Sequence, residues 1–153
     1  MDLKEIMKKS VGRFADKKAD WNAFPDTKDE GFKRAQFRMV GSGGARINDP
    51  NAIEAEKFTV SIMCVPPGQG GRSHAHEVVE AFFMLKGHCI FFIEDENGNR
   101  EEVRLGPWDI IHCPADVYHG FHNDGVENAF LQVIVGTKEL QPIRFRGLEE
   151  AKA

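Results

Sequence analysis

The chain has 153 residues, of which 41% are hydrophobic and 29% are charged. These proportions are typical of one soluble globular domain and argue against a disordered or fibrous chain. The formal net charge of −4 disfavours nucleic acid as a partner, because phosphate binding needs clustered Lys and Arg.

The first predicted element is an amphipathic helix over residues 2–18. Its apolar residues recur at helical spacing: Leu3, Ile6, Met7, Val11 and Phe14. Asp2 is a candidate cap for this helix. The polar segment 26–31 that follows reads as a loop.

Beyond residue 33 the apolar period changes from about 3.6 residues to about 2, which predicts strands. The predicted strands are 33–40, 57–65, 78–85, 88–94, 100–105, 108–113, 118–122 and 129–135. The dipeptide Asn97-Gly98 is a hairpin signal. Short strands separated by turns indicate an all-β sandwich or barrel. We interpret the glycine-rich segment 41–44 as a turn and the tail 147–153 as a short helix.

The cysteine content and the hydropathy of the chain indicate the cellular compartment in which the protein is expected. The three cysteines, Cys64, Cys89 and Cys113, are odd in number and include no CxxC pair. We interpret them as reduced core residues, and a single disulfide between two of them remains the alternative. No apolar run approaches the roughly 18–20 residues of a membrane span, and the N-terminus has no apolar signal segment. We therefore expect a cytoplasmic protein without a membrane partner.

All six histidines lie between residues 74 and 122. In an extended segment His74 and His76 point to the same face, and Glu80 shares their parity. Two imidazoles and a carboxylate suit Fe, Mn, Ni, Co or Zn. The alternative is a pair of loop histidines that bind nothing.

Two longer motifs surround these residues. Residues 68–87 follow the pattern G(x)5HxH(x)3–4E(x)6G at every fixed position. Residues 108–123 follow G(x)5PxG(x)2H(x)3N, except that Trp108 and Asp116 replace its two glycines. In these motifs the chain resembles the cupin superfamily, specifically a small single-domain, metal-binding cupin. We expect Gly106-Pro107 to supply one lost turn and Asp116 to tolerate a left-handed conformation.

The resemblance implies a jelly-roll barrel, also called a double-stranded β-helix, with a short N-terminal helix. It covers residues 55–140, which leaves 1–54 as an N-terminal helix with arm strands and 141–153 as a tail. It also implies one divalent metal ion, of unspecified identity, held by His74, His76, Glu80 and His119. Since related barrels commonly pair through flanking strands, we expect a homodimer in which residues 33–40 form the arm.

Other side chains are candidates for contact with a small-molecule ligand or substrate. Phe82 and Met84 share the parity of Glu80, and Phe121 shares that of His119, so they would form an apolar wall. His112 is a candidate second group near the metal, and Arg38 could pair with a substrate carboxylate. Ordinary core, strand and surface roles are the alternatives for all five. Asn123 is expected to hold a turn, and His88 and His122 to face solvent.

The function expected from this resemblance is that of a metal-dependent, dioxygenase-like oxidoreductase acting on a small organic or aromatic acid. Glu80 would serve as its catalytic base. One alternative is a non-redox isomerase or decarboxylase that uses the metal as a Lewis acid. Another is a metal- or ligand-binding module without turnover, because one fold hosts many functions.

Overall fold

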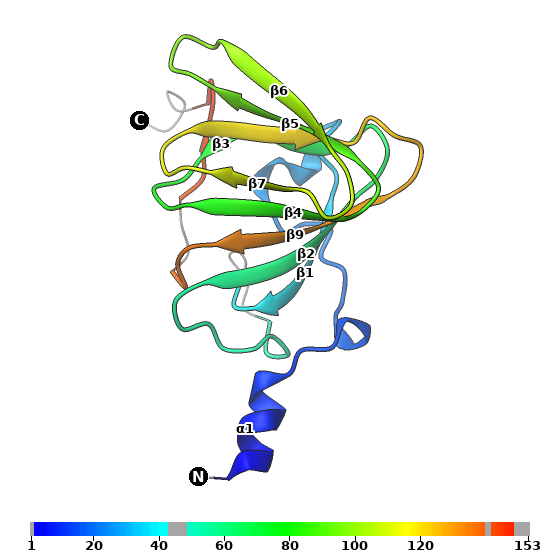
Figure 1. Ribbon diagram of the computed structural model, residues 1–153, viewed down its shortest axis with the longest axis vertical. Helices are drawn as coiled ribbons and strands as arrows, with labels where there is room; N and C mark the ends of the chain where they lie inside the picture. The colour runs from blue at the N-terminus through cyan, green and yellow to red at the C-terminus, as the bar shows by residue number, and fades with distance from the viewer. Residues whose placement is uncertain (1, 43–48, 140–141, 149–153) are drawn as a thin grey trace.

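A computed structural model describes residues 2–42, 49–139 and 142–148. Two five-stranded sheets, with all strand pairs antiparallel, enclose the core (Figure 1). The first sheet has the order β1 (Ala35–Val40), β2 (Thr59–Val65), β9 (Ala129–Val135), β4 (Glu80–Lys86) and β7 (Ile110–Cys113). The second has the order β10 (Arg144–Phe145), β3 (Gly70–Ala75), β8 (Tyr118–His122), β5 (Cys89–Glu94) and β6 (Arg100–Leu105). The predicted all-β jelly roll is confirmed.

The core lies between the two sheets because alternate strand residues point inward. In β9, residues 129, 131, 133 and 135 are buried while the residues between them are half-exposed. The rings of Phe82, Phe91 and Phe121 meet at the centre with centroids 5.3 to 5.5 Å apart. Burying each such ring contributes about 1.5–3 kcal/mol to the stability of the fold.

Two strands, β3 and β10, were missed by the sequence reading. β3 carries no apolar alternation because β8 packs closely against its glycines. A Cβ added to Gly70 would lie 2.0 Å from the carbonyl oxygen of Phe121, and one on Gly71 would lie 2.8 Å from the Phe121 ring. Close packing therefore replaces the usual apolar signal of a strand here.

The N-terminal helix is shorter than predicted. Helix α1 spans Leu3–Ser10, and a 3₁₀ turn, Phe14–Asp16, follows after an extended break. Gly12 disfavours continuation of the helix, and the Phe14 ring packs 4.7 Å from that of Phe37 on β1. Asp2 caps α1 as expected, by accepting a hydrogen bond of 3.0 Å from the Lys4 amide. No residue of α1 is buried, and Figure 1 shows the helix projecting away from the barrel.

The segment 26–31, predicted to be a polar loop, is partly a buried 3₁₀ turn. The turn spans Pro25–Lys28, and the side chains of Asp26 and Thr27 are buried. The reason is an ion pair of 3.0 Å between Asp26 and Arg34, which allows a charged residue to lie inside the protein. The Asn97-Gly98 hairpin is confirmed between β5 and β6, with Gly98 at φ 85°. Gly41 takes a positive φ, whereas residues 43, 44 and 149–153 of the predicted turn and tail lie outside the described residues.

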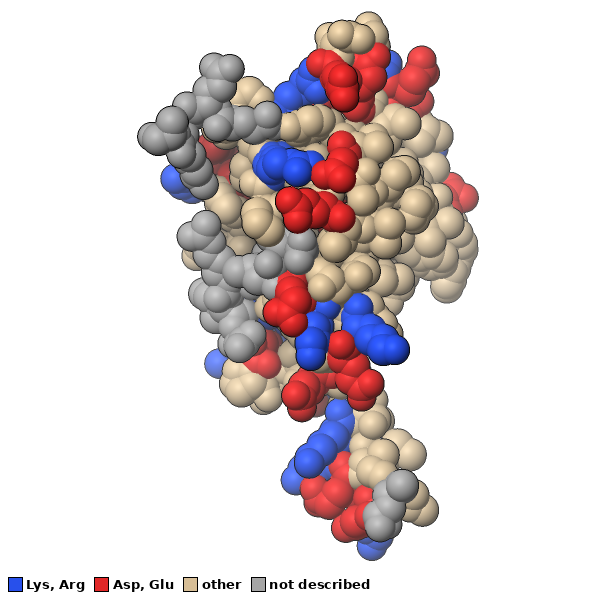
Figure 2. Space-filling model, turned by 90° about the vertical axis from the view of Figure 1, so that its left-hand side faces the viewer, with Lys and Arg blue, Asp and Glu red and all other residues tan. Residues whose placement is uncertain are grey.

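Charged side chains are unevenly spread over the surface. In Figure 2 they are frequent on and beside α1 at the bottom and at the top, whereas the right-hand part, which faces the viewer in Figure 1, is largely uncharged.

Within the described parts of the chain, no helix has the length and apolar character needed to cross a bilayer.

Both positions that depart from the glycines of the second motif are left-handed. Trp108 has φ 76° and Asp116 has φ 65°, so Trp108 itself makes the turn that we expected from Gly106-Pro107. Asp116 tolerates this conformation as predicted. Trp108 is 76% exposed, and its ring meets Phe83 edge-on at 6.0 Å. A bulky, exposed residue therefore occupies a strained backbone position.

Replacing Trp108 by glycine is expected to raise the free energy of unfolding by about 0.5–1 kcal/mol. Relief of left-handed strain, about 1–2 kcal/mol, exceeds the entropy that glycine adds to the unfolded chain. Chemical denaturation followed by circular dichroism measures the change. Asp116→Gly is the matched control and should gain less, because Asp116 tolerates the conformation and also accepts a hydrogen bond from Arg144. A Trp108→Gly protein that is less stable than the parent would contradict the prediction that Trp108 strains the backbone.

Candidate metal centre

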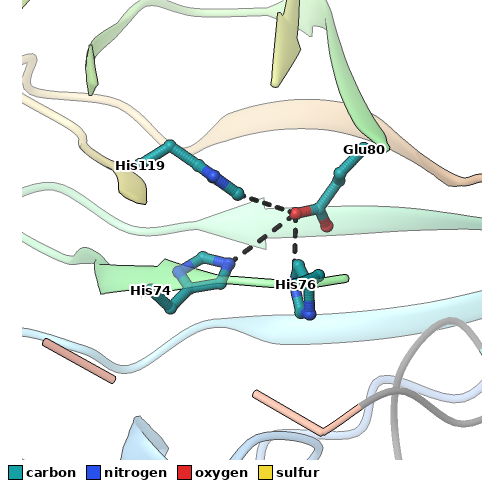
Figure 3. Close-up of side chains that lie close together, drawn as sticks. All are labelled: His74, His76, Glu80 and His119. Carbon is teal, nitrogen blue, oxygen red and sulfur yellow. Dashed lines mark hydrogen bonds and ion pairs between the residues drawn. The ribbon is translucent and has the colours of Figure 1, made fainter. Parts of the chain in front are cut away.

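Four side chains with metal-ligating atoms meet at one end of the barrel (Figure 3). His74 lies in β3, His76 directly follows it, His119 lies in β8, and Glu80 begins β4 in the opposite sheet. The Nε2 atoms of His119, His76 and His74 lie 2.9, 3.3 and 3.7 Å from the same Glu80 oxygen, Oε2. All four residues are buried, and one ligand atom from each lies within 4.8 Å of the others. The group could therefore hold a metal ion.

The strand register explains this convergence. His74 and His119 are directly paired across β3 and β8. Residues 76–79 then cross from the second sheet to the first, so that Glu80 faces back toward the histidines. The crossing is held by the amide of Asp116, which donates a hydrogen bond of 2.7 Å to the carbonyl of His76.

Hydrogen bonds to the other ring nitrogens favour cation binding. His74 Nδ1 lies 2.6 Å from the carbonyl oxygen of Arg72, and His119 Nδ1 lies 2.9 Å from that of Val117. A carbonyl accepts only, so each Nδ1 carries a hydrogen and each neutral ring presents a lone pair at Nε2. Lone pairs that face a carboxylate oxygen repel it unless a proton or a cation lies between them. The donor set thus fits a divalent ion, and the carbonyl contacts fix the ring orientation as in known metal sites.

The electrostatics of the cluster keep Glu80 charged. Burial opposes ionisation of Glu80, but its interactions with His119, His74 and His76 together hold its pKa well below the usual range. Burial also lowers the pKa of His74, partly offset by Glu80. At neutral pH the cluster therefore offers an ionised carboxylate and a His74 ring that favours its neutral form.

The cluster opens into a pocket between the sheets. The space among its lining atoms, which includes open solvent, is about 580 Å³. Its walls are mainly apolar and include Phe24, Met63, Phe82, Phe121, Val133 and Phe145. Phe82 and Phe121 thus line the pocket, as the sequence suggested, and both also belong to the core.

Three other residues predicted to contact a ligand lie outside the lining of this pocket. Met84 has the parity of Glu80 but lies deeper along β4, fully buried in the core and away from the pocket lining. His112 is exposed on the outer face of its sheet, paired with Ala81. Arg38 is buried and ion-paired with Asp20 at 2.5 Å, so its charge is already matched.

Sequence reasoning missed Arg34 and Thr59, which both line the pocket. Arg34 precedes β1, outside the motifs, and Thr59 begins β2. The available signal was the alternation of Arg34, Gln36 and Arg38, which are all buried on the inner side of β1. Alternating polar residues usually mark the solvent-facing side of a strand. Here Arg34 and Arg38 are buried instead, because each forms an ion pair with an aspartate of the preceding segment, Asp26 and Asp20 respectively.

The remaining predicted roles largely hold. Cys64, Cys89 and Cys113 are free and buried, and burial raises the pKa of Cys89 to about 12, so they are core residues rather than nucleophiles. Asn123 holds a turn: its side chain donates to the carbonyls of Val65 and Glu127. His88 is exposed, whereas His122 is half-buried.

Comparison with known proteins gives one family match. Residues 61–135 match the model of the Cupin domain. That segment contains all four clustered side chains, the seven strands β3 to β9, and residues 61–65 of β2.

Two partial relatives carry the same name. The chain is 40% identical over 50 residues to acireductone dioxygenase of Bacillus subtilis (strain 168), covering 33% of this chain and 28% of that enzyme. It is 33% identical over 73 residues to acireductone dioxygenase of Bacillus thuringiensis subsp. konkukian (strain 97-27), covering 47% of this chain and 43% of that enzyme. The similarity therefore spans less than half the length of each relative.

Solved structures share the fold over most of the chain. The polyketide cyclase RemF from Streptomyces resistomycificus superposes with a TM-score of 0.69 and 23% identity, covering 92% of this chain and 87% of that one. The E162A mutant of Bacillus subtilis oxalate decarboxylase gives a TM-score of 0.65 and 15% identity, covering 94% of this chain and 35% of that one. At these identities the likeness establishes the fold alone.

Proposed function

Since residues 61–135 form a cupin domain, we propose that this chain is a metal-dependent, dioxygenase-like oxidoreductase that acts on a small organic or aromatic acid. The observation that carries the proposal is the convergence of three imidazoles and one carboxylate at the inner end of an apolar pocket. The partial similarity to proteins named acireductone dioxygenase supports the oxidative class. The homodimer, the domain boundaries and the cytoplasmic location expected from the sequence stay predictions.

In this proposal His74, His76, Glu80 and His119 hold one divalent ion through Nε2 and carboxylate oxygen atoms. Nitrogen and oxygen donors of this kind suit Fe, Mn, Ni, Co or Zn. A bound ion of this set supplies Lewis-acid chemistry and, for iron or manganese, redox chemistry. The carbonyls of Arg72 and Val117 keep two of the rings in the tautomer that binding requires.

The other groups act on the substrate. Glu80 is held ionised, which is the form that a proton acceptor needs, and its lowered pKa restricts this role to an acidic substrate hydroxyl. Phe82 and Phe121 form a wall against which a flat apolar body packs, and that packing excludes water from the reacting end. These two roles, proton acceptor and apolar wall, are what the chain itself contributes to the reaction.

Oxygen uptake tests the proposed class. Protein purified without an affinity tag is loaded separately with each of the five candidate metals and assayed against acireductone and a panel of small acids and phenols. We expect oxygen consumption that depends on both a redox-active metal and a substrate. Turnover without oxygen, or with zinc, would instead identify a Lewis-acid isomerase or decarboxylase. An absence of turnover across the panel would leave a binding module.

Glu80→Gln separates the two roles of the carboxylate. We expect this variant to lose at least about 100-fold in oxygen uptake, because its amide cannot accept the proton, while the three imidazoles retain part of the metal. Metal content and oxygen uptake are measured on the same preparation. Glu101→Gln, an exposed carboxylate on β6, is the control and should match the parent. Activity that falls only in proportion to metal content would assign Glu80 to ligation alone.

A further inference from the structure

Apart from His76 Nδ1 in the four-residue cluster, two buried polar atoms of residues that line the pocket have no hydrogen-bond partner among the residues that the structure describes: Arg34 Nε and Thr59 Oγ1. Buried polar atoms are nearly always paired, so each such exception requires an explanation. We propose that these two groups bind the substrate and select a small singly charged acid that carries a second oxygen group on an apolar body. The inference rests on the proposed function and names the substrate class of the same pocket.

The Arg34 guanidinium is held so that Nε–H and one Nη2–H are left outside the hydrogen bonds described next. Its Nη1 and Nη2 atoms form two bonds with Asp26, of 3.1 and 3.0 Å, and Nη1 also donates to the carbonyls of Phe32 and Gly70. The ring of Phe24 lies 4.4 Å from the guanidinium carbon. The Nη1 and Nη2 end of the guanidinium is therefore already used by Asp26. The Nε–H on its side edge is left to donate to an oxygen of a carboxylate.

Thr59 lies at the level of the metal-ligating cluster. Both Thr59 on β2 and Glu80 on β4 are paired with Val135 on the strand between them. Their backbones are thus two strand spacings apart, about 9–10 Å, and both side chains are buried and line the pocket. In the proposed binding mode the substrate spans the distance between the cluster and the Thr59 hydroxyl. Arg34 approaches the same pocket from the other end of β2, since its neighbour Ala35 pairs with Cys64.

Charge selects a monoanion. Arg34 and Asp26 neutralise each other, and Glu139, which also lines the pocket, is exposed to solvent. The remaining buried charges of the lining would be those of Glu80 and of a bound divalent ion, which together leave one net positive charge. One anionic group restores neutrality in this low-dielectric space, whereas a dianion would not. The aromatic rings that line the pocket, including Phe24 and Phe82, favour an apolar, flat body for that anion.

Calorimetric titration of zinc-loaded protein tests the inference without any turnover. The probes are 4-hydroxybenzoate, benzoate, which lacks the second oxygen, and 4-hydroxybenzamide, which lacks the charge. We expect 4-hydroxybenzoate to bind the parent protein at least about tenfold more tightly than either of the other two. Equal binding of all three probes to protein that holds zinc overturns the inference, whereas failure to hold zinc overturns the proposed function instead.

Thr59→Val isolates the hydroxyl while keeping the side-chain shape. We expect it to bind 4-hydroxybenzoate about tenfold more weakly, with benzoate unchanged, and to raise Tm by about 2–6 °C because an unpaired buried hydroxyl is removed. Gain of stability with loss of affinity is a pair of effects that a structural hydroxyl would not give. Ser61→Ala is the matched control: Ser61 is buried two residues along the same face, accepts a hydrogen bond of 3.3 Å from Gln36, and lies outside the pocket lining. It should lower Tm and leave binding unchanged.

The Arg34 contribution is tested with the double variant Asp26→Asn/Arg34→Met, which removes both buried charges together and so leaves neither unpaired. We expect the preference for 4-hydroxybenzoate over 4-hydroxybenzamide to fall by about tenfold. If the double variant does not fold, Thr59→Val decides the inference alone. Unchanged affinities in Thr59→Val overturn it.

Discussion

Replacing His76 by alanine is expected to lower the affinity of the chain for a divalent ion by roughly 100-fold or more. His76 supplies one of the three imidazole nitrogens that face Glu80 Oε2, at 3.3 Å. Without it the ion would retain two imidazoles and a carboxylate, and a buried carboxylate oxygen would lose one of its partners. Competition titration against a chromophoric chelator measures the affinity, and elemental analysis measures the content.

His112→Ala is the matched control for this prediction. It removes an imidazole from the same barrel, but from the exposed outer face of β7. Metal affinity should stay within about twofold of the parent, which is the usual scatter of such comparisons. Equal metal content in the two variants would mean that the four-residue cluster is not the binding site.

Asp26→Ala is expected to lower the free energy of unfolding by about 3–5 kcal/mol. The substitution leaves the Arg34 guanidinium, only 4% exposed, without its opposite charge. It also removes the acceptor for the Arg72 amide, which lies 3.2 Å from Asp26 Oδ2. Urea denaturation followed by tryptophan fluorescence gives the change in free energy.

The control for this second prediction lies three residues away. Asp29 forms an ion pair of the same length, 3.0 Å, with Arg72, but both partners are substantially exposed. Asp29→Ala should therefore cost no more than about 1 kcal/mol. Similar losses in the two variants would show that burial of Arg34 does not set the strength of the Asp26 contact.

The grouping of the four candidate metal ligands was predictable because its signal is largely local. His74, His76 and Glu80 lie within seven residues, and strand parity alone places the two imidazoles on one face. His119 could be predicted only from the second motif. The spacing of that motif reflects a strand pairing that the apolar periodicity does not reveal. The structure supplies that pairing as the register between His74 and His119.

Parity states which face of a strand a residue occupies, but not how far along the barrel it lies. Glu80, Phe82 and Met84 all point inward from β4, yet only the first two reach the pocket, since Met84 is sealed in the core. The contact between Arg34 and Asp26 was not predicted for a related reason. It joins two segments whose sequence patterns give no sign that they are neighbours. Residues that act through such long-range contacts, rather than through spacing along the chain, were the ones that sequence patterns missed.

Three of the clustered side chains, His74, His76 and His119, come from one sheet or its end, whereas Glu80 begins a strand of the other. An ion shared by all four would join the two sheets at the mouth of the barrel. A ligand that binds only the folded state adds to the free energy of unfolding, by about 2.7 kcal/mol when its concentration is 100 times its Kd. The folded fraction would then follow the free ion concentration, and metal supply would govern how long each molecule resists proteolysis as well as whether it reacts.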